Sequence, residues 1–322
     1  GVYNRSYLDM RLRQEVSRAH NSGSSLSLAM IQVSDRASAD FKASADAMPA
    51  VAVIFEPLLR DEDLLARFDE STRPVLRRHS GPLRVQKHLY PEGPAVCQHI
   101  IVHPPGGIAG GDRLDISAAV GSGAWTQLTS PGAAKWYRAV GPAFQNVQLR
   151  VEAGATLEWL PQENIFFPGA EARLETRVDL HGDARLALSE GQCLGRPVIA
   201  EAFEQGAVDS RLDIYRNGKP MLLERLRVRP DNRCRLSLMA GMAVGGTLVM
   251  SHALDADVDA CRDLLFADGG DYAGATLIED LLVVRYLGNS TERAQRLLRA
   301  IWQLLRPSTL GRPAVRPRIW AT

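Results

Sequence analysis

The sequence predicts a mainly β protein: an irregular stack of strands, sandwich-like or β-helix-like, with C-terminal helices and a partial α/β segment in front. Three observations lead to this fold class. From about residue 70, apolar residues recur at every second position in short runs that glycines separate. Helical spacing is strong only near the C-terminal end. Residues 1–69 instead mix one helical pattern with strand-like runs, which predicts a separate front segment.

The front segment begins with a helical pattern. Leu8, Leu12 and Val16 lie four residues apart within residues 3–20, which gives a helix one apolar face. A short polar stretch with a glycine, residues 21–23, ends it. Residues 25–33 then predict a buried strand, and residues 50–68 mix helical spacing with acids.

The body, residues 70–322, is predicted from alternation. Acids and arginines occupy the positions between the apolar ones, as in a strand with one buried face. The pattern favours an antiparallel sandwich or an irregular stack of strands, because the glycine spacing is too loose for a strict solenoid repeat. The clearest runs are AWTQLTS (124–130), VQLRVEA (147–153), TLEWL (156–160), ARLETRVDL (172–180) and ARLALSE (184–190).

Two helices are predicted near the end of the body, over residues 255–267 and 289–307. Asn289 and Glu292 have the spacing of a capping box, and Pro307 is expected to end the second helix. Its apolar stripe, which we expect to pack into the core, consists of Leu298, Ile301, Trp302 and Leu305.

Composition excludes several classes of protein. A formal net charge of +1 with 23% charged residues argues against a nucleic-acid partner. Every apolar run is shorter than the roughly 18–20 residues of a membrane span. The phosphate-loop, dinucleotide-binding and nucleophile-elbow motifs are missing, so we expect no enzyme. The cysteines are far apart without a CxxC pair, which favours a reducing, cytoplasmic location; they are Cys97, Cys193, Cys234 and Cys261.

Residues 2–68 resemble the N-terminal half of a diguanylate cyclase (GGDEF) domain. The resemblance rests on YNRSYL (3–8), LSLAMIQV (26–33) and RDEDLLARF (60–68), in that order. The family ends its first strand in a metal-binding Asp and continues into a Gly-Gly-Asp-Glu-Phe hairpin. This sequence has Gln32 and Ser34 at the first place and DESTRP at the second. The resemblance implies ancestry or fusion, without cyclase activity.

Residues 72–322 resemble the UreD (also UreH) family of urease accessory proteins. The matching blocks are TRPVLRRHSGPLRVQK, LYPEG, HPPGGIAGGD, LTSPGAAKWYR, LEWLPQENIFFPGA, CLGRPVI, LLERL and RPRIWAT. The resemblance implies a non-enzymatic chaperone that loads nickel into apo-urease together with UreF and the GTPase UreG. Nickel would be cargo in transit, with no tightly bound cofactor. Family members usually begin with an extra strand ahead of Thr72; either residues 64–68 replace it or the domain lacks that edge strand.

The candidate nickel path contains Asp112, Glu224 and Glu190. Asp112 follows a double-glycine turn, where it either caps the turn or lines an interior path for a divalent cation. Glu224 and Glu190 stand in apolar alternating runs, where a carboxylate is costly unless it is paired or faces water or a metal. Arg225 and Arg196 are the alternative, structural counter-ions. The family motif carries an acid at Glu224, whereas it often has Asp where Glu190 stands.

Cys97, His99 and His103 are weaker metal candidates. They alternate along one strand, so they can share a face, and thiolate and imidazole both bind Ni²⁺. Ile101 shares that face, which makes core packing the stronger interpretation. The rival functions are a β-rich interaction scaffold that conducts no metal and a remnant of cyclic di-GMP signalling.

Overall fold

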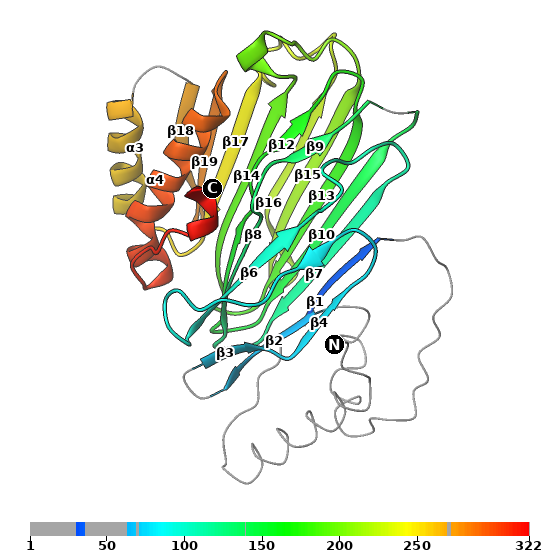
Figure 1. The fold of residues 1–322 in the computed structure, drawn as a ribbon. Coiled ribbons are helices and arrows are strands. Elements are labelled where there is room, and N and C mark those ends of the chain that lie inside the picture. The colour runs from blue at the N-terminus through cyan, green and yellow to red at the C-terminus, as the bar shows by residue number, and fades with distance from the viewer. Residues whose placement is uncertain (1–29, 36–62, 69–70, 139, 269–271, 322) are drawn as a thin grey trace.

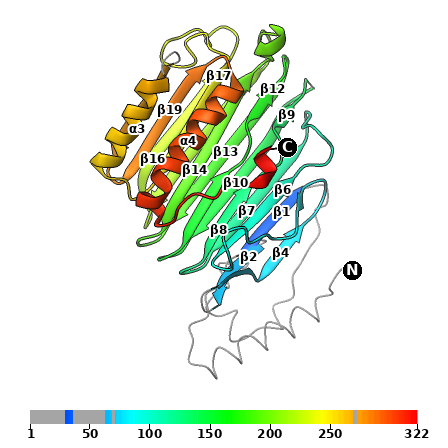
Figure 2. The same cartoon turned by 60° about the vertical axis from the view of Figure 1, so that its left-hand side comes forward.

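The computed structural model describes residues 30–35, 63–68, 71–138, 140–268 and 272–321. Two large β-sheets lie face to face, and helices cover the outer face of one of them (Figures 1 and 2). The predicted fold class is therefore confirmed. The helix predicted over residues 3–20 lies outside the described residues.

The nine-stranded sheet runs in the order β16 (Lys219–Val228), β15 (Ala207–Arg216), β13 (Glu171–Leu180), β10 (Ala143–Val151), β7 (Arg113–Val120), β1 (Met30–Asp35), β2 (Asp63–Phe68) and β3 (Ser71–Pro74), with β4 (Leu76–His79) paired to β1. The ten-stranded sheet runs in the order β18 (Tyr272–Ile278), β19 (Leu281–Gly288), β17 (Val244–Met250), β14 (Arg185–Leu194), β11 (Thr156–Leu160), β8 (Trp125–Thr129), β6 (Val96–Val102) and β5 (Arg84–Val85), joined by β12 (Asn164–Phe166) and β9 (Ala134–Trp136).

The central strands are parallel, so of the two predicted arrangements the antiparallel sandwich is wrong for the middle of both sheets, and the stack of strands is confirmed. β10 pairs in parallel with β7 and β13, and β11 does so with β8 and β14. The physical reason is that the chain alternates between the two sheets through the middle of the body, from β7 to β8, β10 to β11 and β13 to β14. Neighbours within a sheet therefore come from successive coils and run in the same direction. Beyond the last parallel pairs, the pairing becomes antiparallel: β16 pairs with β15 in one sheet, and β17 pairs with β14 in the other.

Where the chain passes from one sheet to the other, the turns contain glycines, and the turns of successive coils lie beside one another. Gly154 and Gly182 have φ of +73° and +54°, in the left-handed region that glycine adopts at little cost. The Gly154 amide donates to Asp183 Oδ1 at 2.7 Å, and the Gly182 amide donates to Asn217 Oδ1 at 2.9 Å. Each turn is thus held by a side chain of the next coil.

Two apolar cores separate the layers. One fills the space between the sheets, and the other lies between the ten-stranded sheet and the helices α3 (Asp255–Asp268) and α4 (Thr291–Leu310). The short 3-10 helix η2 (Pro197–Ile199) lies between β14 and β15, and η3 (Arg318–Ala321) is the last described element. Among the described residues, no helix is both long and apolar enough to cross a membrane.

The ends of α4 differ from the prediction, although its predicted apolar stripe is buried. Ser290 caps the helix by accepting a bond from the Arg293 amide, while Asn289 instead accepts one from the Ala243 amide. Pro307 lies inside the helix, which continues to Gly311 at φ +87°. Proline has no amide hydrogen, so Pro307 removes one backbone hydrogen bond near the end of the helix. The helix is not broken there.

Strands from the front segment extend the nine-stranded sheet. β1 pairs antiparallel with β7, and β2 pairs in parallel with β7 over Asp63, Leu64 and Leu65 (Figure 1). Residues 64–68, which were one of the two alternatives for the extra family strand, therefore contribute a strand at this edge.

Candidate functional site

Two neighbouring cavities lie between the sheets, with volumes of about 210 and 230 Å³. Glu190 and Gln192 line both of them. Both side chains belong to β14, the strand at which parallel pairing changes to antiparallel pairing in the ten-stranded sheet. The cavities therefore meet at two polar side chains inside the protein.

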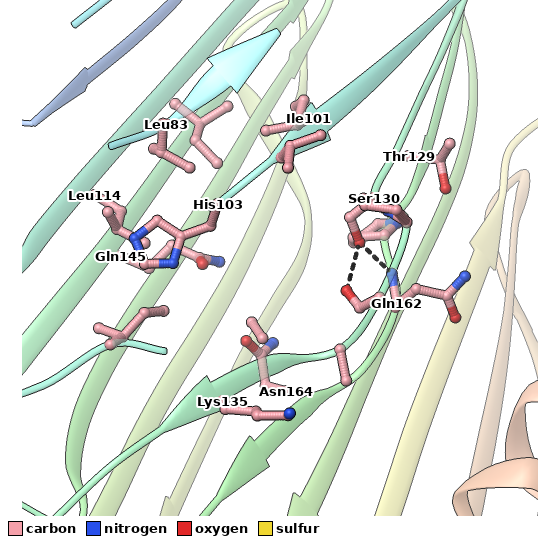
Figure 3. Close-up of a pocket in the computed structure, with 18 of the residues that line it drawn as sticks. Leu83, Ile101, His103, Leu114, Thr129, Ser130, Lys135, Gln145, Gln162 and Asn164 are labelled. Atoms are coloured by element: carbon pink, nitrogen blue, oxygen red, sulfur yellow. Dashed lines mark hydrogen bonds between the residues drawn. The ribbon is translucent and has the colours of Figure 1, made fainter. Parts of the chain in front are cut away.

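The first cavity is lined mainly by apolar side chains, with polar ones among them. Figure 3 shows His103, Lys135 and Asn164 around it. Asn164 is fixed because its Oδ1 accepts a bond from the Trp136 indole at 2.9 Å. Ser130 Oγ accepts a bond from the Gln162 amide, just after the neighbouring strand β11, at 2.9 Å. The lining thus offers imidazole, amide, hydroxyl and ammonium groups, of which only the ammonium is permanently charged.

The second cavity lies between two facing rows of side chains, which the strand registers define. On the nine-stranded sheet, Thr176, Leu212 and Glu224 stand opposite one another across β13, β15 and β16. On the ten-stranded sheet, the row consists of Glu190, Thr247 and Arg285 across β14, β17 and β19. Two contacts join the rows across the gap.

The inner contact is a hydrogen bond from Thr176 Oγ1 to Glu190 Oε1, at 2.6 Å. Glu190 keeps some accessible surface because it faces the cavities, yet protein surrounds it on all sides. Burial raises the pKa of Glu190 to about 7, the Thr176 bond opposes this rise, and the Glu224 charge adds to it. Glu190 therefore lies close enough to Glu224 for the two charges to interact.

The outer contact is an ion pair between Glu224 and Arg285. Arg285 Nη2 lies 3.0 Å from Oε2 of Glu224 and Nε lies 3.2 Å from Oε1. The expected alternative partner, Arg225, pairs with Asp209 instead, at 2.7 and 2.8 Å. Glu224 and Arg285 side chains are 31% and 46% exposed, so this end of the row is closer to solvent than Glu190.

Asp112 occupies the turn that its sequence indicates. Its Oδ2 accepts a bond from the Ala109 amide at 2.8 Å, and its side chain is exposed. The turn is also closed by the bond from the Asp112 amide to the Ala109 carbonyl, at 3.0 Å. Asp112 is not among the residues that line either cavity. The capping geometry of the first alternative is present, and a role in cation entry stays a prediction.

Cys97 and His99 lie together in the interior, while His103 lines the first cavity. Cys97 Sγ is 3.2 Å from His99 Nε2. Burial raises the pKa of the Cys97 thiol to about 12 and lowers the pKa of His99 to about 3, so both are neutral at pH 7. Within the described residues, no group of three or more His, Cys, Asp or Glu side chains could hold a metal ion.

Sequence reasoning missed Thr176, Gln192 and Arg285. Arg196, the other proposed counter-ion, pairs with Glu201 at 2.6 Å and not with Glu190. Alternation within ARLETRVDL places Thr176 on the inner face, but its contact with Glu190 follows only from the packing of the two sheets. A search for polar residues at inward positions of neighbouring strands would have found Thr176 and Gln192.

The family model described as "UreD urease accessory protein" matches residues 63–321. This match begins at Asp63, so it includes residues 63–68, which the sequence analysis placed in the cyclase-like segment. It covers most of the residues that the structure describes.

Curated relatives match this chain over nearly their whole length. The chain is 54% identical over 282 residues to urease accessory protein UreD 2 of Pseudomonas syringae pv. syringae, covering 85% of this chain and 99% of the relative. It is 53% identical over 260 residues to UreD of Pseudomonas aeruginosa, covering 80% and 92%. These relatives are named as accessory proteins, in agreement with the expectation that the chain is not an enzyme. The chain belongs to the UreD family of urease accessory proteins.

Proposed function

We propose that this chain is a chaperone of urease maturation that passes nickel into apo-urease through the two cavities, in a complex with UreF and the GTPase UreG. The observation that carries the proposal is the shared lining of the cavities by Glu190 and Gln192. A path through the protein needs such a junction, because separate pockets would only store an ion. GTP hydrolysis is assigned to the partner.

The chemistry of the junction suits an ion in transit. Glu190 offers a carboxylate, and among the described residues the buried Oε1 of Gln192 accepts no hydrogen bond. Scattered oxygen ligands bind Ni²⁺ more weakly than a closed set of thiolates and imidazoles, so they release it. Glu224, a few side chains further along the facing rows, gives a second carboxylate toward the solvent.

The other predicted metal residues have smaller roles in this proposal. Asp112 is exposed and would serve only before the ion enters. His103 lines the first cavity and is the one of the three weaker candidates on the path. Cys97 and His99 are neutral and in contact with each other, which favours their packing role.

A Glu190→Gln variant tests the path. The amide keeps the size of the side chain and a hydrogen-bonding partner for Thr176 but removes the charge. We expect urease that matures with this variant to contain several-fold less nickel, while complexes with UreF, UreG and apo-urease still assemble. Glu279→Gln is the control, because Glu279 is exposed and pairs with Lys219 at the surface. Urease with full nickel content from the Glu190 variant would refute conduction and favour an interaction scaffold.

The cyclase-like segment, which lies mainly outside the described residues, is proposed to be a degenerate fusion without catalytic activity. The absence of cyclase activity can be tested directly. The full chain incubated with GTP and Mg²⁺ is expected to form no cyclic di-GMP, and measurable turnover would contradict this.

A further inference from the structure

Arg285 covers the solvent end of the second cavity. Its guanidinium binds both carboxylate oxygens of Glu224 and joins β19 of one sheet to β16 of the other. Both side chains line the cavity that leads to Glu190. An ion that enters from this end therefore meets Glu224 with the guanidinium already bound to it.

The ion pair makes Glu224 a poor cation ligand while it lasts. A forked guanidinium uses both oxygens and neutralises the carboxylate charge that would attract a divalent cation. Its own positive charge also repels the cation at short range. Glu224 is therefore a stronger ligand for nickel after Arg285 has moved away.

Arg285 has both the weak attachment and the space to move. The pair is partly exposed, with the Arg285 side chain 46% exposed, and such pairs are easily replaced. In the β18–β19 register Arg285 stands opposite Gly274, and a Cβ atom built at Gly274 would meet nothing within 4 Å. β18 is the last strand of its sheet, so the space beside Arg285 opens toward the sheet edge.

We propose that Arg285 is a gate residue that decides when Glu224 accepts a cation. In the closed arrangement its guanidinium holds Glu224, and in the open arrangement it turns toward the Gly274 side and leaves the carboxylate free. The proposal rests on the proposed function, since it gives Glu224 its use on the nickel path. It adds a residue whose removal increases cation binding, whereas removal of a path carboxylate decreases it.

The test is Ni²⁺ binding to the purified full chain by titration calorimetry, with the metal alone as the probe. Arg285→Met keeps the aliphatic stem and removes the charge, and it is expected to bind Ni²⁺ about ten-fold more tightly than the parent chain. Arg225→Met is the matched control, because Arg225 lines the same cavity but pairs with Asp209, and its affinity should stay within about two-fold of the parent.

A double variant identifies the ligand that the gate releases. Arg285→Met combined with Glu224→Gln should return to the affinity of the parent chain or below it. Equal affinities of the Arg285 variant and the parent would overturn the gate, as would an equal gain in the Arg225 control. Arg285→Gln serves as a second replacement if the Met side chain causes aggregation, and thermal unfolding checks that each variant is folded.

The results for Glu190→Gln and Arg285→Met together distinguish the proposed gate from the proposed nickel path. If Glu190→Gln lowers the nickel content of urease while Arg285→Met binds nickel like the parent, the path stands and the gate fails. If Arg285→Met binds more tightly while Glu190→Gln loads urease fully, Arg285 still controls a cation site but that site does not supply urease.

Discussion

Replacing Arg306 by Met should remove a large part of the folding stability of this chain. Arg306 is fully buried in α4 and forms two bonds to Glu158, at 3.0 and 2.8 Å, and two to Glu92, at 2.7 and 2.8 Å. Glu158 is fully buried and Glu92 is 6% exposed. The guanidinium also lies over the rings of Trp125 and Trp302, at 5.0 and 5.5 Å.

The magnitude follows from what the replacement leaves behind. Met fills much of the aliphatic volume, so the main loss is electrostatic: two carboxylates remain in the interior without their shared cation. Breaking a buried ion pair from one side costs about 3–5 kcal/mol, because the remaining charge has no water to replace its partner. The indole donors of Trp125 and Trp302, both 2.8 Å from Glu158, keep part of that carboxylate satisfied. We therefore expect a loss near the lower end, about 3 kcal/mol.

Chemical denaturation measures the change, as a shift in the midpoint at unchanged slope. Arg177→Met is the control, because Arg177 pairs with Asp179 at the surface, with 51% and 35% exposed side chains, and should cost less than about 0.5 kcal/mol. Adding Glu92→Gln and Glu158→Gln to Arg306→Met should recover much of the stability. A loss under about 1 kcal/mol, or a triple variant no more stable than the single one, would refute the argument.

The same variant should show a characteristic pH dependence. Burial raises the pKa of Glu92 above its ordinary value, and the bonds from Arg306 limit this rise. Without Arg306 the pKa of Glu92 rises further, so folding favours the protonated acid. A raised pKa in the folded state means stability that is lost as the pH rises through it. The deficit of Arg306→Met should accordingly be smaller at pH 5 than at pH 7.5.

Three further predictions follow from burial and backbone geometry. Burial raises the pKa of Glu190 to about 7, so its contribution to stability falls as pH rises from its ordinary value of 4.5 to about 7; Glu190→Gln should flatten the measured stability over this window, and an unchanged slope would argue against the raised pKa. In the native protein a thiol reagent should modify the exposed Cys234 rapidly and the buried Cys97 only on unfolding, because burial raises the pKa of the Cys97 thiol to about 12. Gly195→Ala should lower the melting temperature far more than Gly141→Ala: both have positive φ, but a Cβ at Gly195 would lie 2.2 Å from a backbone oxygen and one at Gly141 would meet nothing, so equal effects would contradict the packing argument.

Local patterns predicted the parts of the fold that depend on neighbours in the chain. TLEWL predicts β11 with the observed bounds, and the stripe with Ile301 and Trp302 predicts the buried face of α4. The cap of that helix was placed one residue early, because Asn289 and Ser290 are both good capping residues. Only the tertiary contact to the Ala243 amide, which Asn289 makes, decides between them.

Strand direction and the polar rows could not be predicted in this way. Alternation gives the faces of a strand but not its neighbours, and parallel and antiparallel sheets with one buried face have the same alternation. Asp112 looked the better candidate because a glycine turn marks it, whereas Glu190 stands in an ordinary run. The alternation within that run does not show that Glu190 accepts a bond from Thr176, fourteen residues away and across the gap between the sheets.

The position of the second cavity follows from the way the coil ends. Through the middle of the body, parallel strands from successive coils place mainly apolar side chains between the sheets, around the first cavity. At β14 and β15 the pairing changes, and the later strands β16 and β17 pair with them antiparallel. These strands need not repeat the apolar pattern of the coil, so they bring Glu224 on one sheet and Thr247 with Arg285 on the other. Polar side chains then face each other across the second cavity, which lies where the pairing direction changes.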